Sequence, residues 1–296
     1  MATAIAKTIV ATGASSGLGF EAVKQLLQQT QPYRFILGAR DLRSTQAAYD
    51  GLKYDAAMHS VSILPLELAD LRGVKSFAQQ TLDKLGNDNL DILLLNAAMN
   101  KPATGPGPNG SKWCEALVVN NLSQHYLTHL LEEKVRESRS RVVVVSSGSI
   151  RNIRDDDPDT LDIDLKADSG ADGFVVYGAS KFAQLLSTHW WRRRLGNSAR
   201  VVAVSPGLIP GTGLGRHLDI KFDMNSLPDA KPVDEGAKSI LQALTRDDFP
   251  SDPEQIFLTS WGEWWPKDVY SLSLDEALQC KWSPSKEQIE KEELAR

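Results

Sequence analysis

A tyrosine and a lysine whose types and spacing could move a proton stand at Tyr177 and Lys181, with Gly-Ala-Ser between them. Residues four apart lie on one face of a helix, so the ammonium of Lys181 can lie close to the phenol of Tyr177. A phenol has a pKa near 10 and is protonated at neutral pH, whereas a neighbouring cation favours the phenolate. Lowering that pKa by about three takes roughly 4 kcal/mol, which an ammonium in a partly desolvated site can supply. Alone the pattern is common by chance, so its meaning depends on what accompanies it.

A glycine-rich turn near the N-terminus has the composition of a phosphate-binding loop. The stretch 12–19, Thr-Gly-Ala-Ser-Ser-Gly-Leu-Gly, directly follows the apolar run 8–11 and leads into a stretch of helical length. Glycine allows a tight turn and a close approach of backbone N–H groups to a phosphate, and the start of a helix offers unpaired N–H donors. A simple strand-to-helix turn is the alternative, but this context is the one that dinucleotide binding requires. The residues predicted to contact the cofactor here are Gly13, Ser15, Ser16, Gly17, Leu18 and Gly19.

The residue after the second apolar run indicates which dinucleotide binds. An acidic side chain there would accept hydrogen bonds from the ribose 2′-hydroxyl and repel a 2′-phosphate. This chain has Arg40 instead, whose planar and permanently charged guanidinium suits a phosphate. The alternative is a surface arginine paired with Asp41. We therefore predict NADP(H), with Arg40 and Ser15 around the 2′-phosphate and Arg43 as a further candidate.

These motifs need elements that bring them together, and the apolar pattern supplies them. Short runs rich in Val, Ile and Leu, mostly without polar alternation, predict strands that are buried on both faces of a sheet. Stretches of helical length lie between them, and this alternation predicts a Rossmann-type α/β fold, a doubly wound parallel sheet of about seven strands with helices on both faces. The predicted strands are 8–11, 34–37, 61–66, 92–95, 142–145, 201–204 and 256–258, and the predicted helices are 19–29, 74–85, 113–136, 177–195 and 235–244.

The chain of 296 residues is predicted to form a single domain, because no repeat or low-complexity linker interrupts the alternation. Residues 1–206 would form the cofactor-binding and catalytic core, and 207–296 the substrate-side loops, the last strand and a C-terminal helix. Two segments break the pattern. The acidic stretch 151–173 predicts a solvated insertion or, alternatively, a loop that borders the substrate mouth. The Trp-rich segment 261–265 predicts either a lid over the substrate or a small satellite core.

Charge and composition exclude several classes of protein. The chain has 33 Lys and Arg against 38 Asp and Glu, a formal net charge of −5, which argues against a nucleic-acid binder. No apolar stretch is long enough to span a membrane, no signal peptide is evident and the two cysteines form no disulfide framework, so we expect a soluble cytoplasmic protein. His125 and His129 lack an acidic third ligand at a suitable spacing, so no metal site is predicted.

Together, the glycine turn and the Tyr-Lys pair make the chain resemble the short-chain dehydrogenase/reductase superfamily, from Thr12 to about Thr212. The superfamily's further motifs follow in order, as Leu-Asn-Ala-Ala at 95–98, Val-Asn-Asn-Leu-Ser at 119–123, Ser-Ser-Gly at 146–148, Pro-Gly at 206–207 and Thr212. Within the superfamily, the stretch 206–216 and the Asn-Ala-Ala turn look similar to those of protochlorophyllide reductases and retinol dehydrogenases. The Trp-rich tail is similar to that of reductases from fungal secondary metabolism.

The resemblance implies a catalytic tetrad of Asn120, Ser147, Tyr177 and Lys181. Tyr177 would protonate the nascent alkoxide in reduction, or act as the base in oxidation. Lys181 would hold the nicotinamide ribose and lower the pKa of Tyr177. Ser147 would donate a hydrogen bond to the substrate carbonyl oxygen, and Asn120 would position a water that relays protons to Lys181. The remaining implied cofactor contacts are Glu67, which replaces the usual Asp, and Leu68, Asn96, Ala97, Pro206, Gly207, Ile209 and Thr212.

The resemblance also implies a function. The chain would be an NADP(H)-dependent oxidoreductase that transfers a hydride between the nicotinamide and the carbonyl or alcohol carbon of an apolar small molecule, polycyclic or polyketide-like, with ketone reduction favoured. One alternative is reduction of a conjugated C=C bond at the same site, and another is an NADP(H)-binding regulator without turnover. The helices that carry Asn120 and Tyr177 often pair two subunits in this superfamily, so a homodimer is a further prediction.

Overall fold

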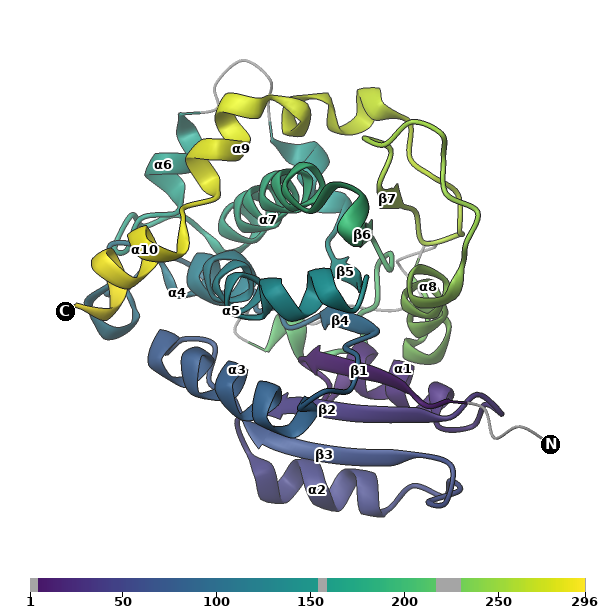
Figure 1. Cartoon of the computed structure of the whole chain (residues 1–296). Coiled ribbons are helices and arrows are strands. Elements are labelled where there is room, and N and C mark those ends of the chain that lie inside the picture. Colours follow the sequence, from purple (N-terminus) through teal and green to yellow (C-terminus); the bar gives the residue numbers. More distant parts are fainter. Residues whose placement is uncertain (1–4, 154–158, 217–229, 296) are drawn as a thin grey trace.

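Seven parallel strands form one sheet in the computed structural model, which describes residues 5–153, 159–216 and 230–295 (Figure 1). The strands are β1 (Lys7–Thr12), β2 (Tyr33–Ala39), β3 (Ser60–Pro65), β4 (Ile92–Leu95), β5 (Arg141–Val145), β6 (Arg200–Val204) and β7 (Phe257–Leu258). Their order across the sheet is β3-β2-β1-β4-β5-β6-β7. The order runs one way from β1 to β3 and the other way from β4 to β7, so the sheet is doubly wound and a crevice is expected at the carboxyl ends of β1 and β4. The predicted α/β fold class is confirmed.

The predicted strand boundaries lie within two residues of the observed ones. The prediction extends one strand to residue 66, whereas β3 ends at Pro65, which has no N–H to continue a ladder. Residue 256 also lies outside β7. The edge strand β3 is only partly buried, whereas the central strands are buried along nearly their whole length. The apolar runs therefore predict the centre of the sheet more sharply than its edge.

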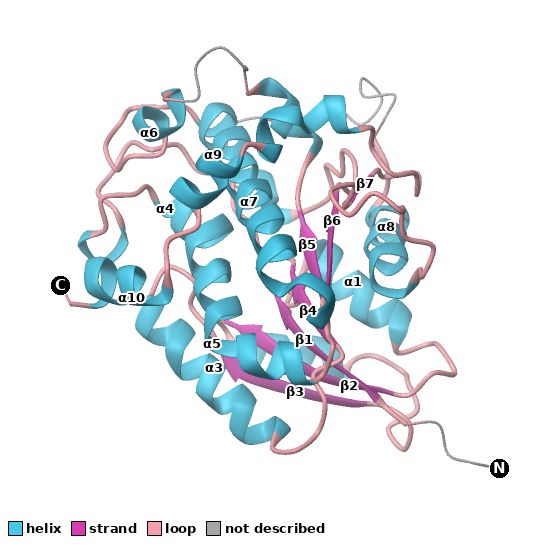
Figure 2. Ribbon diagram, turned by 45° about the horizontal axis from the view of Figure 1, so that its top comes forward, coloured by secondary structure: helices cyan, strands magenta, loops and turns pink. Residues whose placement is uncertain are grey.

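Helices cover both faces of the sheet, and alternate side chains of each strand decide which helices they meet. In β1, Val10 packs with α3 (Leu71–Leu85), α5 (Ser123–Glu137) and α7 (Gly173–Leu195). Its neighbours Ile9 and Ala11 pack with α1 (Gly17–Leu26) and α8 (Val233–Thr245) on the opposite face. Figure 2 shows these two groups of helices on opposite sides of the strands. This two-sided burial explains why the strands lack polar alternation.

The helix predicted over 113–136 is divided. A short α4 (Glu115–Leu117) leads into a π-helical turn, Val118–Leu122, before α5 begins at Ser123. A π turn inserts one extra residue into the helix and is frequent at functional sites. Here the turn contains Asn120, which is fully buried. The insertion changes the direction of the Asn120 side chain relative to a regular helix, which the periodicity of the sequence does not reveal.

The C-terminal segment packs over the helices predicted to form a subunit interface. Helix α9 (Glu276–Trp282) lies along α7, and α10 (Lys286–Ile289) lies beside α5 (Figure 1). Every residue of α7 from 178 to 189 is buried within the same chain. The hydroxyl of Ser187 donates to the carbonyl of Trp282 at 3.0 Å. A homodimer through α5 and α7 would therefore have to use the little of these helices that stays exposed, because this chain's own C-terminus covers the rest.

The charged C-terminal stretch is more firmly attached than a solvated cap. Ile289 is 1% exposed, and the carboxylate of Glu290 pairs with Lys75 at 3.0 Å. The Tyr126 hydroxyl donates to the same carboxylate at 2.8 Å. The stretch therefore ties α3 and α5 together. The predicted C-terminal helix is α10 followed by a π-helical turn, Glu290–Leu294.

The described part of the acidic stretch is largely exposed, as a solvated insertion would be, but it is also anchored to the rest of the chain. Leu161 and Leu165 are fully buried, and Lys281 pairs with the carboxylates of Asp159 and Asp162. These carboxylates lie in or next to α6 (Thr160–Asp164). Asp155, Asp156 and Asp157 lie outside the described residues. None of the described residues from 159 to 173 lines the cleft that is described below, so they give no support to the mouth-loop alternative.

The Trp-rich segment forms mainly a satellite core. Trp265 is 6% exposed and packs on Phe257, with ring centroids 4.7 Å apart. Trp264 lies against Phe249, whereas Trp261 is 63% exposed.

Among the residues that the structure describes, no helix has the length and apolar character that crossing a bilayer requires.

Candidate active site

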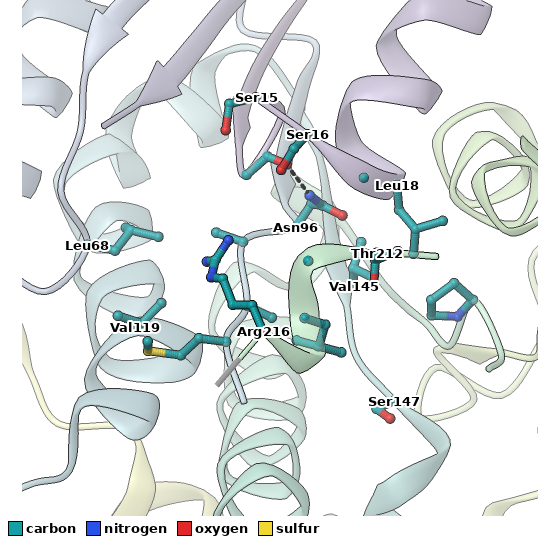
Figure 3. A pocket seen from close by; sticks show the side chains of 18 of the residues that line it. Ser15, Ser16, Leu18, Leu68, Asn96, Val119, Val145, Ser147, Thr212 and Arg216 are labelled. Carbon is teal, nitrogen blue, oxygen red and sulfur yellow. Dashed lines mark hydrogen bonds between the residues drawn. The ribbon is translucent and has the colours of Figure 1, made fainter. Parts of the chain in front are cut away.

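A cleft opens at the carboxyl ends of the strands, where the motifs meet. It encloses about 1290 Å³ that no protein atom fills, part of it open to solvent. In Figure 3, the glycine-rich turn with Ser15 and Ser16 lies at one end of the cleft and Ser147 at the other. The residues predicted from sequence that line it are Gly13, Ser15, Ser16, Gly17, Leu18, Arg40, Glu67, Leu68, Asn96, Ala97, Ser147, Tyr177, Lys181, Pro206, Gly207, Ile209 and Thr212.

Two predicted site residues do not line the cleft. Gly19 is buried behind the turn, where a Cβ atom would lie 2.4 Å from the Asn96 Nδ2 atom. Gly19 thus allows α1 to pack closely on the turn, and its contact with the cofactor stays a prediction. Asn120 is fully buried behind the cleft wall. Arg43, the further candidate for a phosphate contact, is exposed on α2 (Leu42–Asp50) and also lies outside the lining.

The structure adds lining residues that sequence reasoning missed. Half of them directly follow or precede a predicted site residue, so their closeness to a predicted motif was an available signal. Arg216 and Glu115 are different, because they bring charge to the cleft from the loop after β6 and from α4. The missed lining residues are Gly38, Ala39, Leu66, Ala98, Met99, Glu115, Val119, Val145, Ser146, Gly213, Leu214 and Arg216.

The glycine-rich turn is shaped as a cradle before any ligand binds. Gly13 has φ +65°, and a Cβ atom there would lie 2.6 Å from the Cα atom of Ala97, so only glycine fits. The Asn96 side chain donates to the Gly13 carbonyl at 2.7 Å and fixes the turn against the end of β4. The N-terminus of α1 carries no side-chain cap, because Ser16 makes no capping hydrogen bond. Its first N–H groups therefore remain available to an anion.

Arg40 extends this anion site along the cleft. The alternative that pairs it with Asp41 is not supported, because the Asp41 carboxylate accepts from the Ser44 N–H at 3.0 Å and caps α2. Arg40 is exposed and lines the cleft. No ion pair of Arg40 is found within residues 5–153, 159–216 and 230–295. Its guanidinium is thus free to meet a phosphate group.

Tyr177 and Ser147 meet at the other end of the cleft. Tyr177 lies one turn into α7, which begins after Asp172 caps it by accepting from the Phe174 N–H at 2.8 Å. Burial raises the pKa of Tyr177 to about 12, and a hydrogen bond with the Ser147 side chain acts in the opposite direction. The phenol is therefore protonated at neutral pH and can donate a proton. The Ser147 hydroxyl also accepts from the Ser149 hydroxyl at 3.0 Å, which fixes its position.

Lys181 differs from the prediction in its effect on Tyr177. Its Nζ atom lies 6.0 Å from the centroid of the Tyr177 ring and donates to the Val145 carbonyl at 2.7 Å and to the Gln184 side chain at 3.1 Å. Burial without a carboxylate partner lowers the pKa of Lys181 to about 7. Burial therefore dominates the pKa of both groups, and the predicted lowering of the Tyr177 pKa by Lys181 stays a prediction.

Asn120 also differs from the prediction. Its side-chain oxygen accepts from the Met99 N–H at 2.8 Å, and its side-chain nitrogen donates to the Met99 carbonyl and to the Ser180 hydroxyl, both at 2.9 Å. The side chain therefore ties the loop after β4 to α7. Its backbone carbonyl accepts from the Gln124 and Gln184 side chains at 3.0 and 2.7 Å. Two side-chain amides thus occupy this carbonyl, and the relay water at Asn120 stays a prediction.

The two histidines predicted not to bind a metal are packing residues. His125 accepts from the Trp191 indole N–H at 2.9 Å, and its other ring nitrogen lies 2.9 Å from the Pro284 carbonyl. Burial lowers the pKa of His125 to about 3, so the ring is neutral. No cluster of metal-ligating side chains occurs in the described part of the chain.

Comparisons with known proteins agree with this geometry. The family model for short chain dehydrogenases matches residues 7–153. A short-chain dehydrogenase/reductase of Pestalotiopsis microspora is 69% identical over 98% of this chain and the full length of that protein. Retinol dehydrogenase 14 of Mus musculus is 29% identical over 93% of this chain and 83% of that protein. The structure of an NADPH-bound carbonyl reductase from chicken fatty liver superposes with a TM-score of 0.63 at 20% identity, over 89% of this chain and 96% of that chain.

Proposed function

The chain belongs to the short-chain dehydrogenase/reductase family, and we propose that it is an NADP(H)-dependent reductase of ketones or aldehydes on apolar small molecules. The observation that carries the proposal is the meeting of Tyr177, Lys181 and Ser147 in one cleft with the glycine-rich anion cradle. A regulator without turnover would not need a protonated phenol and a buried ammonium in the same cleft. The complete group of side chains therefore favours catalysis.

The residues present fit a phosphorylated dinucleotide. The cradle at Gly13 would be filled by any Cβ atom, and the uncapped start of α1 faces the same cleft. Arg40 supplies a charged donor that suits a 2′-phosphate. Solved structures with this fold include a carbonyl reductase bound to NADPH and an alcohol dehydrogenase complexed with 5-hydroxy-NADP. These features together support NADP(H) as the cofactor.

The chain's own residues supply proton transfer and orientation. When bound, the nicotinamide supplies the hydride. The protonated Tyr177 hydroxyl gives its proton to the substrate oxygen, and Ser147 donates a hydrogen bond to the same oxygen. Lys181, anchored on the Val145 carbonyl, holds the ribose next to the reacting carbon. A pKa of about 12 keeps Tyr177 in its acid form, which supports reduction as the favoured direction.

An apolar substrate is supported by the side chains near Tyr177. Phe174, Tyr177 and Lys181 lie on one face of α7, at spacings of three and four residues. Phe174 is 53% exposed and stands one turn before the phenol on this face, although it does not itself line the cleft. Met99 and Val119 add apolar lining. The relatives named for retinol, itself an apolar molecule, support the same substrate class.

The proposal is tested by following the loss of NADPH absorbance with purified protein and a panel of polycyclic ketones, quinones and enones. Turnover of ketones with NADPH, and slower turnover with NADH, is expected. Products identified by mass and NMR separate carbonyl reduction from reduction of a C=C bond. Tight NADPH binding with no turnover across the panel would favour the regulator instead.

Arg40→Ala is expected to weaken NADPH binding by about 10- to 100-fold and NADH binding by no more than about twofold, because hydrogen bonds to a charged group contribute roughly 1.5–3 kcal/mol. Titration of protein fluorescence with each cofactor measures both dissociation constants. Arg43→Ala is the matched control, since Arg43 is equally exposed but does not line the cleft. Equal losses of affinity for NADPH and NADH in Arg40→Ala would contradict the assignment of Arg40 to the 2′-phosphate.

Because Phe174 is exposed one turn before Tyr177 on the same face of α7, Phe174→Glu is expected to raise KM for an apolar ketone severalfold while leaving NADPH affinity unchanged. An acidic residue in the first turn of a helix is favourable, so the fold should tolerate the change. Val175→Glu is the matched control, because Val175 is 42% exposed but points about 100° away around α7. A similar KM in both variants would show that this face of α7 does not contact substrate.

A further inference from the structure

The side chain of Gln184 connects two groups of the active site. Its Oε1 atom accepts from the Lys181 ammonium at 3.1 Å, and its Nε2 atom donates to the Asn120 carbonyl at 2.7 Å. Gln184 is 3% exposed and lies on α7, less than one turn after Lys181. Only this orientation of the amide is satisfactory, because an ammonium has no acceptor and a carbonyl has no donor. The bridge therefore has one defined geometry.

Protein groups occupy the path between Asn120 and Lys181. The Asn120 carbonyl accepts from the side chains of Gln124 and Gln184. The Lys181 ammonium has three protons, of which one goes to the Val145 carbonyl and one to Gln184. One proton remains for the cleft that Lys181 lines.

We propose that Gln184 is a positioning residue that takes the place of a relay water between Lys181 and Asn120 and fixes the Lys181 ammonium for catalysis. The inference rests on the proposed function, because it gives Lys181 the task of holding the nicotinamide ribose. An amide cannot pass a proton along as a water does. Lys181 is therefore held in place from behind and exchanges protons on the side of the cleft.

A second, small cavity lies behind Gln184, between α5 and α7. Gln184 lines this cavity, whereas Lys181 lines only the main cleft, so the amide stands between the two. The surface of this cavity is largely apolar, and the hydroxyls of Thr128, Ser187 and Thr188 that border it bond to protein carbonyls. A water admitted by shortening residue 184 would therefore find its polar partners in the Lys181 ammonium and the Asn120 carbonyl.

Two substitutions at this position separate positioning from packing. Gln184→Leu keeps most of the volume but offers no acceptor and no space for water, so kcat should fall by roughly tenfold, the loss expected for one hydrogen bond to a charged group. Gln184→Ala leaves space for a water between Lys181 and Asn120, so its kcat should stay within about threefold of wild type. A packing role predicts the opposite order, because alanine leaves a cavity that leucine fills.

The experiment measures kcat and the NADPH dissociation constant for wild type and both variants. A kcat that is higher for Gln184→Ala than for Gln184→Leu supports the proposal, and an equal or reversed order overturns it. Gln184→Met, unbranched like glutamine, replaces the leucine variant if that one does not fold. If the wild type turns over no substrate, the proposed function fails, and the dissociation constants decide the inference alone. NADPH affinity that decreases from wild type to Ala to Leu supports it, whereas equal affinities, or no NADPH binding by wild type, overturn it.

Discussion

Tyr177→Phe is expected to lower kcat for ketone reduction by about 10²- to 10⁴-fold, the usual contribution of a positioned general acid. The variant loses only the hydroxyl that hydrogen bonds with Ser147. The ring remains, so the packing of α7 and the cofactor cleft should not change. NADPH affinity is therefore expected to stay within about twofold of wild type, which a fluorescence titration measures alongside single-turnover rates.

The pH dependence of the wild type provides a second readout of the same residue. Because burial raises the pKa of Tyr177 to about 12, the phenol keeps its proton throughout the neutral and mildly alkaline range. Deprotonation of Tyr177 should therefore cause no loss of reduction rate below about pH 10. Tyr54→Phe is the matched control, since Tyr54 packs on His59, with ring centroids 6.4 Å apart, and does not line the cleft. A kcat in Tyr177→Phe equal to that of this control would exclude Tyr177 as the proton donor.

The sequence was sufficient to predict the sheet because its strands are buried on both faces. Runs such as the one in β4 have no polar alternation, which only a covered sheet explains. Helix α2 escaped prediction because its sequence is mostly polar and only Thr45 and Tyr49 are buried. The available signal was Asp41, which caps it. Helix α9 also escaped prediction, because it is short and depends on contacts with α7 that no local pattern shows.

Most of the cleft lining could be predicted because parallel strands bring their carboxyl ends to one edge. A motif that ends a strand therefore lies in the crevice, as Arg40 and Ser147 do. The exceptions are residues that are buried behind the surface of the cleft. Gly19 and Asn120 belong to the predicted motifs, yet both are buried behind the wall of the cleft. Burial depends on the packing of distant elements, so spacing along the chain could not show it.

The motif also could not predict the pKa values of Tyr177 and Lys181, because these too depend on burial. Spacing on a helix predicts that Lys181 lies near Tyr177, and the two are indeed on one face of α7. Spacing does not show that both groups lose their hydration, which raises one pKa and lowers the other. Gln184 was an available signal, because a residue three positions after Lys181 shares its face. Its partner Asn120 is brought there only by the π-helical turn.

The burial of Lys181 destabilises the folded chain, and this effect can be measured through the pH dependence of the free energy of unfolding. Its folded pKa of about 7 lies below the ordinary value of 10.5, so between these values the unfolded chain binds more protons than the folded one. The buried lysine therefore destabilises the folded chain most below pH 7, and this destabilisation disappears as the pH rises towards 10.5. Relative to Lys181→Met, the wild type should gain roughly 3 kcal/mol in free energy of unfolding between pH 7 and about pH 9.5, because one proton contributes about 1.4 kcal/mol per pH step.

Urea unfolding of wild type and Lys181→Met across this pH range measures the difference. Methionine leaves the Val145 carbonyl and the Gln184 side chain without a donor, which offsets part of the variant's gain, so the slope with pH is diagnostic and the absolute difference is not. Lys238→Met, on the exposed side of α8, controls for the loss of a lysine as such. If the difference in free energy of unfolding between wild type and Lys181→Met does not change with pH, burial does not lower the pKa of Lys181 in the folded chain. A steep slope, together with loss of turnover in Lys181→Met, would show that the chain retains a destabilising charge because the active site needs it.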